Sequence, residues 1–318
     1  MHQKIENNIY LNIYFIKIYL STPTMEKTLI SKADALIKNA KKEISPRFKL
    51  FDFYKDQEQK YENAAIMFTD AANLFKIEKQ WILAGDAFVD AAHCYIKRNS
   101  RYEASGKYID AANCYKKVDN LLCIKSFDAA IELLATIGKF TTAAKHLGTV
   151  AGIYENDIFD LEKSIEYFEK AADYFKCEES NPNVIKCRLT SARLFAQTEK
   201  YERAIQVYDE CAAEMIDDPI LKFSVNDICM KSILCRMCIG DIIGAKIALE
   251  RCETQFCGFF NSRSYNFLKK IIGAAEENNI DHFMDYVTDY DYISVLDIWM
   301  TTILLRIKKQ IFNGTIEL

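Results

Sequence analysis

The sequence predicts an all-α fold, an α-solenoid built from antiparallel helical hairpins. A pair of small residues returns about every twenty positions between Ala71 and Ala212, and aromatic residues stand at fixed offsets from it. Only 4 of the 318 residues are proline and 10 are glycine, which favours helices over a turn-rich β architecture. With 50% hydrophobic residues, the chain is long enough to bury a continuous core.

The repeating frame places aromatic, small and aromatic residues on one helix face, because positions i, i+3 and i+7 share a face. Its small pairs are Ala71-Ala72, Ala91-Ala92, Ala111-Ala112, Ala151-Gly152, Ala171-Ala172, Ser191-Ala192 and Cys211-Ala212, and the pair Ala129-Ala130 is shifted by two positions. The aromatic residues before the pairs are Phe68, Phe88, Tyr108, Phe168 and Tyr208, and those after them are Phe75, Tyr95, Tyr115, Tyr154, Phe175 and Phe195. Each unit of about twenty residues is therefore one helix and a short turn. Two units make a hairpin that has to stack on its neighbours to bury its apolar face.

The first 24 residues differ from the rest. The segment from Ile9 to Leu20 is apolar, but it is short and is interrupted by Asn12 and Lys17. It lacks a basic flank and a good cleavage site, which argues against a signal peptide. We expect residues 1–24 to be a leader that is unstructured in, or absent from, the working protein, and the folded chain to begin at Met25.

The segment that follows is basic. Between Met25 and Lys55, basic residues outnumber acidic ones two to one and are interleaved with aromatic residues. Pro46 interrupts the helix, so the stretch from Ser45 to Phe53 is expected to form a loop. Apolar side chains beside lysines suit the surface of an anionic membrane. Alternatively, these aromatic residues cover the end of the first hairpin's core, and the sequence does not decide between the two.

The eleven cysteines are expected to be reduced thiols that fill the core. The spacing C-x2-C-x13-C-x4-C is compatible with a zinc site, and the four residues are Cys235, Cys238, Cys252 and Cys257. Their surroundings have an apolar helical pattern rather than the polar turns of a zinc knuckle, and no histidine lies among them. No metal and no other cofactor is therefore predicted.

No enzyme signature is present. The sequence lacks the phosphate-binding loops G-x-x-x-x-G-K-[ST] and G-x-G-x-x-G, the zinc-protease motif H-E-x-x-H and the nucleophile motif G-x-S-x-G. The net charge of −4 excludes a strongly basic nucleic-acid-binding chain. We therefore predict neither catalysis nor nucleic-acid binding, and a solenoid of this kind typically binds other proteins.

An acidic run stands near the C-terminus. No lysine or arginine lies between its first and last members, and its acids are Glu276, Glu277, Asp281, Asp285, Asp289, Asp291 and Asp297. A solvated helix face explains part of this run, whereas a docking surface for a basic partner explains all of it.

Several segments have amino-acid sequences similar to those of one known family. They are Ala143 to His146, Ile153 to Glu155, Glu162-Lys163, Ala172 to Lys176, Glu178 to Asn181, Lys186-Cys187 and, most specifically, Leu296 to Lys309. They resemble the alpha-type soluble NSF attachment protein (alpha-SNAP) family of adaptors. The resemblance runs from about Met25 to the end of the chain, and it is closer to the alpha and beta members than to the gamma member.

The resemblance implies a TPR-like solenoid over residues 25–240 and a C-terminal helical bundle with a tail over residues 241–318. Members of the family coat the four-helix bundle formed by syntaxin-type and partner SNAREs. They recruit and stimulate the hexameric AAA ATPase NSF, which takes that bundle apart after membrane fusion in vesicle-mediated transport. The implied partners are therefore the SNARE bundle, NSF and a membrane surface. The implied location is cytoplasmic, with peripheral attachment to membranes.

The resemblance also implies roles for single residues. The SNARE-binding residues are expected to be Lys116, Lys117, Lys139, Lys145 and Lys186. The membrane-contacting residues are expected to be Phe48, Leu50 and Phe51. The ATPase-binding residues are expected to be Asp241, Glu276, Glu277 and Leu318, of which Leu318 would stimulate ATP hydrolysis. No catalytic residue and no metal ligand is implied.

The chain also departs from the family pattern. Gly273 stands where relatives usually carry a glutamate, Thr190 and Asn226 stand where they often carry lysine, and the acidic tail is reduced to Glu317. The alternative function is a TPR-like scaffold that presents its groove to a peptide and has no ATPase partner. The C-terminal signature and the terminal leucine favour the adaptor.

Overall fold

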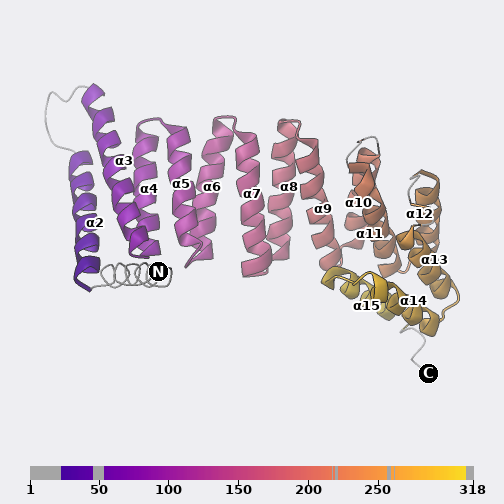
Figure 1. Cartoon of the computed structure of the whole chain (residues 1–318). Coiled ribbons are helices and arrows are strands. Elements are labelled where there is room, and N and C mark those ends of the chain that lie inside the picture. The colour runs from indigo at the N-terminus through magenta and orange to yellow at the C-terminus, as the bar shows by residue number, and fades with distance from the viewer. Residues whose placement is uncertain are drawn as a thin grey trace, which may run out of the picture. The chain divides into compact units, whose positions relative to one another are not determined.

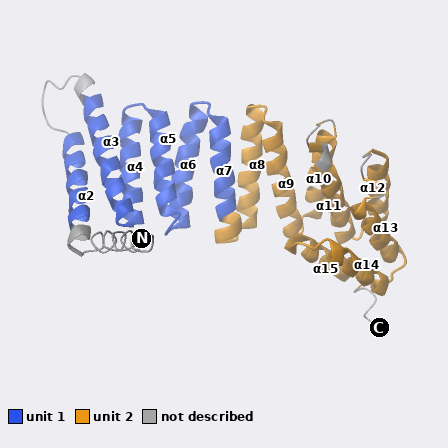
Figure 2. Cartoon of the chain, in the orientation of Figure 1, with its two compact units in different colours: residues 1–153 blue, residues 154–318 orange. Residues whose placement is uncertain are grey.

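The computed structural model describes residues 23–45, 54–216, 218, 221–255, 259–260 and 262–312 (Figure 1). These residues are almost entirely helical and include no strand, which confirms the predicted all-α class. The chain forms two compact units, Met1–Ile153 and Tyr154–Leu318 (Figure 2). Among the described residues, no helix combines the length and the apolar character that crossing a membrane requires.

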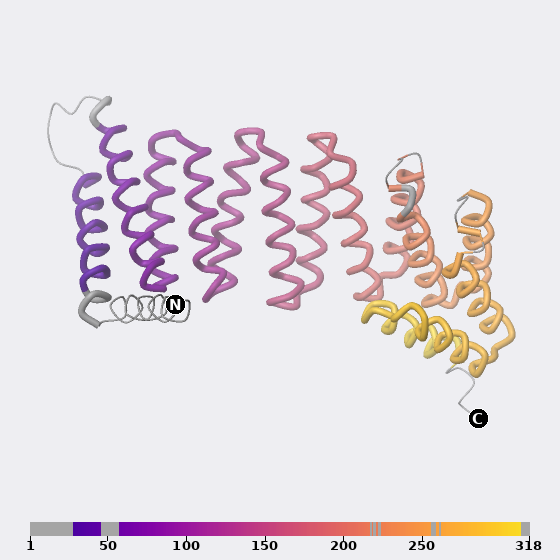
Figure 3. The backbone as a smooth tube through the Cα atoms, viewed as in Figure 1, coloured from indigo at the N-terminus to yellow at the C-terminus, as the bar shows by residue number. Residues whose placement is uncertain are grey.

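The described helices of unit 1 follow one another as antiparallel neighbours (Figure 3). They are α2 (Pro23–Ile44), α3 (Tyr54–Ile77), α4 (Trp81–Lys97), α5 (Arg101–Tyr115), α6 (Asn120–Thr136) and α7 (Phe140–Ile153). From α4 onward each helix and its turn take about twenty residues, as the repeating frame predicts.

Unit 2 continues the frame through three helices and then changes. A π-helix, η1 (Tyr154–Ile158), precedes α8 (Leu161–Cys177), α9 (Asn181–Gln197) and α10 (Tyr201–Met215). The remaining elements are the 3-10 helix η2 (Leu221–Ser224), α11 (Val225–Cys238), α12 (Ile242–Gln255), α13 (Arg263–Glu276), α14 (Ile280–Ile293) and α15 (Ile298–Phe312). The domain boundary expected after residue 240 falls inside unit 2, between α11 and α12, and stays a prediction.

The small pairs of the frame lie where the helices meet. Both alanines of the pairs at 71, 91 and 111 have no exposed surface, and Ser191 is 1% exposed. Large aromatic residues of the frame are buried around them, including Phe68, Phe75 and Phe88. Small side chains let neighbouring helices approach closely, and the rings fill the remaining space.

Most short turns use one residue in the left-handed region, a conformation that closes a helix C-terminus. These residues are Lys79, Asn99, Phe159, Glu179, Glu199 and Asn278, with φ between 50° and 63°; among the described residues, the glycines with positive φ are Gly138 and Gly240. Non-glycine residues adopt this region at some energetic cost. Since most of these turns contain no glycine at that position, the sequence did not mark them as helix ends.

Gly85 lies under the ring of Tyr115, where α4 and α5 pack. A Cβ atom at this position would stand 2.4 Å from Tyr115 Cε1 and 2.5 Å from Cζ. The ring has little freedom to retreat, because the Tyr115 hydroxyl donates to Asp86 Oδ1 at 2.5 Å. Gly85→Ala is therefore expected to lower the free energy of unfolding by about 1–3 kcal/mol through overpacking, as measured by urea denaturation.

Gly106→Ala is the matched control, because no atom lies within 4 Å of a Cβ built at this helical glycine. Alanine there should stabilise the protein by roughly 0.5–1 kcal/mol through helix propensity. Equal stabilisation by both substitutions would contradict the close approach at Gly85.

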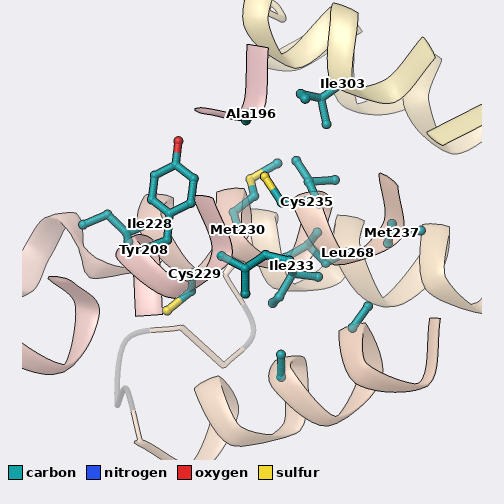
Figure 4. Close-up of a cluster of buried hydrophobic side chains, with 14 of the residues drawn as sticks. Ala196, Tyr208, Ile228, Cys229, Met230, Ile233, Cys235, Met237, Leu268 and Ile303 are labelled. Carbon is teal, nitrogen blue, oxygen red and sulfur yellow. The ribbon is translucent and has the colours of Figure 1, made fainter. Parts of the chain in front are cut away.

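The core of unit 2 gathers around α11 (Figure 4). Ile233, Leu234 and Cys235 have no exposed surface, and Leu268 of α13 and Ile307 of α15 are equally buried. This core holds together α10 to α15, because each of these helices contributes buried side chains to it.

Arg306 joins α15 to the turn between α9 and α10. Its guanidinium donates to the carbonyl oxygens of Ala196 at 2.9 Å and Gln197 at 3.0 Å, and to the Tyr201 hydroxyl at 3.2 Å. It also forms an ion pair with Glu199 at 3.4 Å. The side chain therefore adds a charged donor to two carbonyls at the end of α9, of which that of Ala196 also accepts from the Glu199 N–H at 3.3 Å.

Candidate functional site

The five lysines expected to bind SNAREs are all exposed. They are Lys116, Lys117, Lys139, Lys145 and Lys186, and the described part of the chain places no carboxylate within ion-pair distance of any of them. Other cations are already engaged: Lys107 pairs with Asp110 at 3.2 Å, and Lys200 with Glu162 at 2.6 Å. The five lysines are thus positive charges that a partner can neutralise.

The four lysines of unit 1 do not form one cluster. Lys116 and Lys117 lie in the turn between α5 and α6, whereas Lys139 lies in the turn at the other end of α6. The 17 residues of α6 separate these turns by about 25 Å. Lys139, Thr142 and Lys145 form a stripe at a spacing of three, which starts at the residue before α7 and continues on that helix. Lys139 and Lys145 are therefore about 9 Å apart along the helix axis.

His146 follows Lys145 on α7 and adds no charge to that stripe at neutral pH. Its ring stacks on Phe127 with centroids 5.4 Å apart. Burial, together with the neighbouring Lys145 cation, lowers the pKa of the imidazole below its usual value. The stripe is therefore carried by the two lysines alone.

Lys186 lies on α9 in unit 2, on a different face from Arg188. Arg188 is neutralised by α10, because its guanidinium pairs with Glu210 and, at 2.7 Å, with Glu214. That face borders a groove of about 860 Å³ with several carboxylates. Lys186 stands apart from this groove and keeps a free charge.

Asp241 begins α12 and caps it. Its Oδ1 accepts a hydrogen bond from the Gly244 N–H at 2.8 Å. The other oxygen lies directly over Gly244, because a Cβ built there would be 1.9 Å from Asp241 Oδ2. The carboxylate is exposed, so it can cap the helix and still face a partner.

Glu276 and Glu277 end α13, next to the start of α12. Glu276 pairs with Lys246 of α12 at 2.7 Å, and this hydrogen bond raises the pKa of Lys246. Glu277 lies 3.9 Å from His282 Nδ1, a contact that is ionic only when the imidazole is protonated. The structure thus brings the expected ATPase-binding acids Asp241, Glu276 and Glu277 to one end of unit 2.

The last turn of α15 reaches the same end. Phe312 packs on Phe283 in the first turn of α14, with ring centroids 5.3 Å apart. Gln310 lies beside the α11–α12 turn, since its Nε2 would be 3.7 Å from a Cβ at Gly240. We call the surface formed by Asp241, Glu276 and Glu277 the acidic end.

The rest of the acidic run has two kinds of member. Asp297 Oδ1 accepts from the Met300 N–H at 2.7 Å at the start of α15, and Asp291 Oδ1 accepts from the Leu296 N–H at 2.8 Å, so both fix the α14–α15 turn. Asp281, Asp285 and Asp289 are exposed along α14, with no ion pair to a described base. Helix capping therefore explains part of the run and leaves α14 with uncompensated charge.

An exposed apolar turn between α14 and α15 was not predicted from the sequence. Tyr292 is 90% exposed, Val295 is 89% and Ile298 is 87%. Asp291 and Asp297 flank the segment, and Ser294 interrupts it, so it does not stand out by hydrophobicity alone. Only the packing of α14 and α15, which turns these side chains outward, reveals them.

Some expected site residues lie outside the described residues. These are Phe48, Leu50 and Phe51 of the expected membrane loop, and Leu318. Of the four cysteines with zinc-like spacing, Cys257 also lies outside them, while Cys235, Cys238 and Cys252 are buried in helices. Within the described ranges, no three His, Cys, Asp or Glu side chains are grouped so that they could hold a metal ion.

The family model described as "Soluble NSF attachment protein, SNAP" matches residues 31–312. The alpha-soluble NSF attachment protein of Mus musculus is 40% identical over 281 residues, which cover 88% of this chain and 95% of the relative. The protein of the same name from Dictyostelium discoideum is 40% identical over 268 residues, covering 83% and 91%. Among solved structures, a Pyrococcus horikoshii STAND protein with a tetratricopeptide repeat sensor aligns with 98% of this chain and 48% of its own, at a TM-score of 0.41 and 14% identity.

Proposed function

Because the chain belongs to the soluble NSF attachment protein family, we propose that it is an adaptor that binds assembled SNARE bundles and recruits and stimulates the AAA ATPase NSF. Proteins of this family are adaptors rather than enzymes, and the chain is not an enzyme. The proposed process is the disassembly of SNARE bundles in vesicle-mediated transport. The observation that carries the proposal is that the chain bears two surfaces of opposite charge on different helices: free lysines on the repeat helices, and the acidic end on α12 and α13.

The proposed SNARE contacts are the exposed lysines, chiefly Lys145 on α7 and Lys186 on α9. A SNARE bundle with an acidic surface would give each lysine the counter-charge that the described part of the chain does not supply. Lys139 extends the stripe on α7, whereas Lys116 and Lys117, at the far end of α6, are proposed as an outer contact. Such exposed pairs contribute about 0.2–1 kcal/mol each, so affinity depends on several of them together.

Lys145→Glu combined with Lys186→Glu is expected to weaken binding of a soluble SNARE bundle about fivefold or more at low salt, because two attractions become repulsions. The fold should persist, since both side chains are exposed. Binding is measured by isothermal calorimetry at two salt concentrations.

Lys32→Glu combined with Lys176→Glu is the matched control, because it changes the net charge equally at two other exposed lysines. It should bind the SNARE bundle nearly as the unchanged protein does. If both double variants lose affinity equally, only net charge matters, and the assignment of Lys145 and Lys186 is wrong.

The proposed ATPase contact is the acidic end. Asp241 and Glu277 carry free or nearly free charge, whereas Glu276 is held by Lys246 in the isolated chain. A basic docking domain of the ATPase has to compete with Lys246 for this carboxylate. Lys246 therefore limits the affinity that the acidic end can reach.

Lys246→Gln is expected to strengthen ATPase recruitment about two- to fivefold, because it releases Glu276 and removes a like charge from the surface offered to a basic partner. The measurement is the dissociation constant of the ATPase hexamer for the adaptor bound to a SNARE bundle.

Lys200→Gln serves as control, since Lys200 forms a similarly exposed pair with Glu162 at 2.6 Å and no ion pair with Asp241, Glu276 or Glu277. It should leave recruitment unchanged. Weaker recruitment by Lys246→Gln would show that Lys246 itself contacts the ATPase.

Two parts of the proposal rest on the resemblance alone. Phe48, Leu50 and Phe51 are proposed to contact the membrane, which would hold the adaptor peripherally at a cytoplasmic membrane surface. Leu318 is proposed to stimulate ATP hydrolysis.

A further inference from the structure

Two buried thiols from neighbouring helices meet in unit 2. Cys229 of α11 and Cys252 of α12 are each 4% exposed, and their side chains hydrogen-bond to each other. The two thiols are therefore neighbours inside unit 2. This pair takes no part in the SNARE or ATPase contacts proposed above.

Both thiols line one cavity of about 190 Å³. A water molecule occupies roughly 30 Å³ in the liquid, so the cavity has room for a small oxidant. Its rim includes the exposed residues Ala213, Arg251 and Gln255, which open it to solvent.

The cavity has a positive side. Asp209 and Arg251 line it, and the Asp209 carboxylate pairs with Arg251 at 3.2 Å and with Arg236, behind the lining, at 2.6 Å. The hydrogen bond from Cys229 and the charges of Arg251 and Arg236 lower the pKa of Cys252. Burial opposes this shift at Cys252, and it raises the pKa of Cys94 and of Cys211 to about 11. Cys252 is therefore the thiol of the pair that ionises more readily.

We propose that Cys229 and Cys252 are a modification site at which hydrogen peroxide forms a disulfide between α11 and α12. The Cys252 thiolate attacks one peroxide oxygen, the O–O bond breaks, and the departing hydroxide takes up the thiol proton and leaves as water. Cys252 is then a sulfenic acid. The Cys229 sulfur attacks it, the S–O bond breaks, and water leaves with the Cys229 proton. Two thiols are oxidised by two electrons, and one peroxide is reduced to two waters.

The test uses the reduced full-length protein, treated with hydrogen peroxide and then alkylated. Two of the eleven thiols should escape alkylation, and the mass should fall by two hydrogen atoms. Trypsin should then release residues 223–231 joined to residues 252–263, and dithiothreitol should separate the two peptides. Because the second peptide also contains Cys257, the same map is made with C257S, which should retain the link.

Three more variants complete the test. C229S and C252S should lack the link, and C229S should accumulate a sulfenic acid on Cys252 that dimedone traps. C235S should form the link as the unchanged protein does, because the sulfurs of Cys229 and Cys235 point in different directions on α11 (Figure 4). Absence of the linked peptides in C257S, or their persistence in C252S, overturns the proposal. The C257S map decides it even where a serine variant at 229 or 252 fails to fold.

Discussion

Replacing Arg306 by methionine is expected to lower the free energy of unfolding of unit 2 by about 2–4 kcal/mol. The change removes a charged donor from the carbonyls of Ala196 and Gln197 and from the Tyr201 hydroxyl. Partly buried acceptors that lose a charged partner cost about 1–3 kcal/mol, and the ion pair with Glu199 is lost as well. Methionine keeps the aliphatic contacts of the stem, so the loss reports on the guanidinium.

The measurement is thermal and urea unfolding of the full chain. Arg203→Met is the matched control, because Arg203 is half exposed and its pair with Glu169 is 3.7 Å long. It should change stability by less than about 0.5 kcal/mol. Similar stabilities for the two variants would mean that α15 is held by its apolar face alone.

Neutralising the acidic end is expected to reduce ATPase recruitment about tenfold and to leave SNARE binding unchanged. The variant combines Asp241→Asn, Glu276→Gln and Glu277→Gln, which remove charge and preserve size. Asparagine at position 241 can still accept the Gly244 N–H, so the start of α12 should keep its cap. Three pairs of about 0.2–1 kcal/mol each account for a loss of this size.

The matched control neutralises three exposed acids of the α8 region, by Glu166→Gln, Asp173→Asn and Glu178→Gln. Recruitment is measured as the dissociation constant of the ATPase hexamer for the adaptor on a SNARE bundle. Equal losses in both triple variants would show that long-range charge, rather than the acidic end, attracts the ATPase.

The sequence predicted the parts of the fold that depend on neighbouring residues. The pair Ala91-Ala92 and the ring of Phe88 mark one buried helix face, and the structure confirms that face. Periodicity was enough because each repeat helix packs mainly on the next one along the chain. The left-handed turns at Lys79 and Glu199 were less visible, since glycine is absent from both positions.

Contacts between distant residues could not be predicted from the sequence. Arg306 meets Ala196 across 110 positions, and Lys246 meets Glu276 across 30. Helix periodicity predicts contacts only between residues three or four positions apart, so it predicts neither of these pairs. Both contacts exist only once α12, α13 and α15 have packed. The sequence therefore indicated that Glu276 is a candidate contact, but not that a lysine already holds it.

As the proposed adaptor, the chain has to join a SNARE bundle to the ATPase. The direct measurement is gel filtration of purified hexameric NSF, held in its ATP state, with a soluble SNARE bundle, in the presence and absence of this protein. All three are expected to elute as one complex when the protein is present, whereas NSF and the SNARE bundle should elute separately when it is absent. If the protein binds the SNARE bundle, or a peptide, but leaves NSF in its own peak, the adaptor function is wrong and the scaffold without an ATPase partner is favoured.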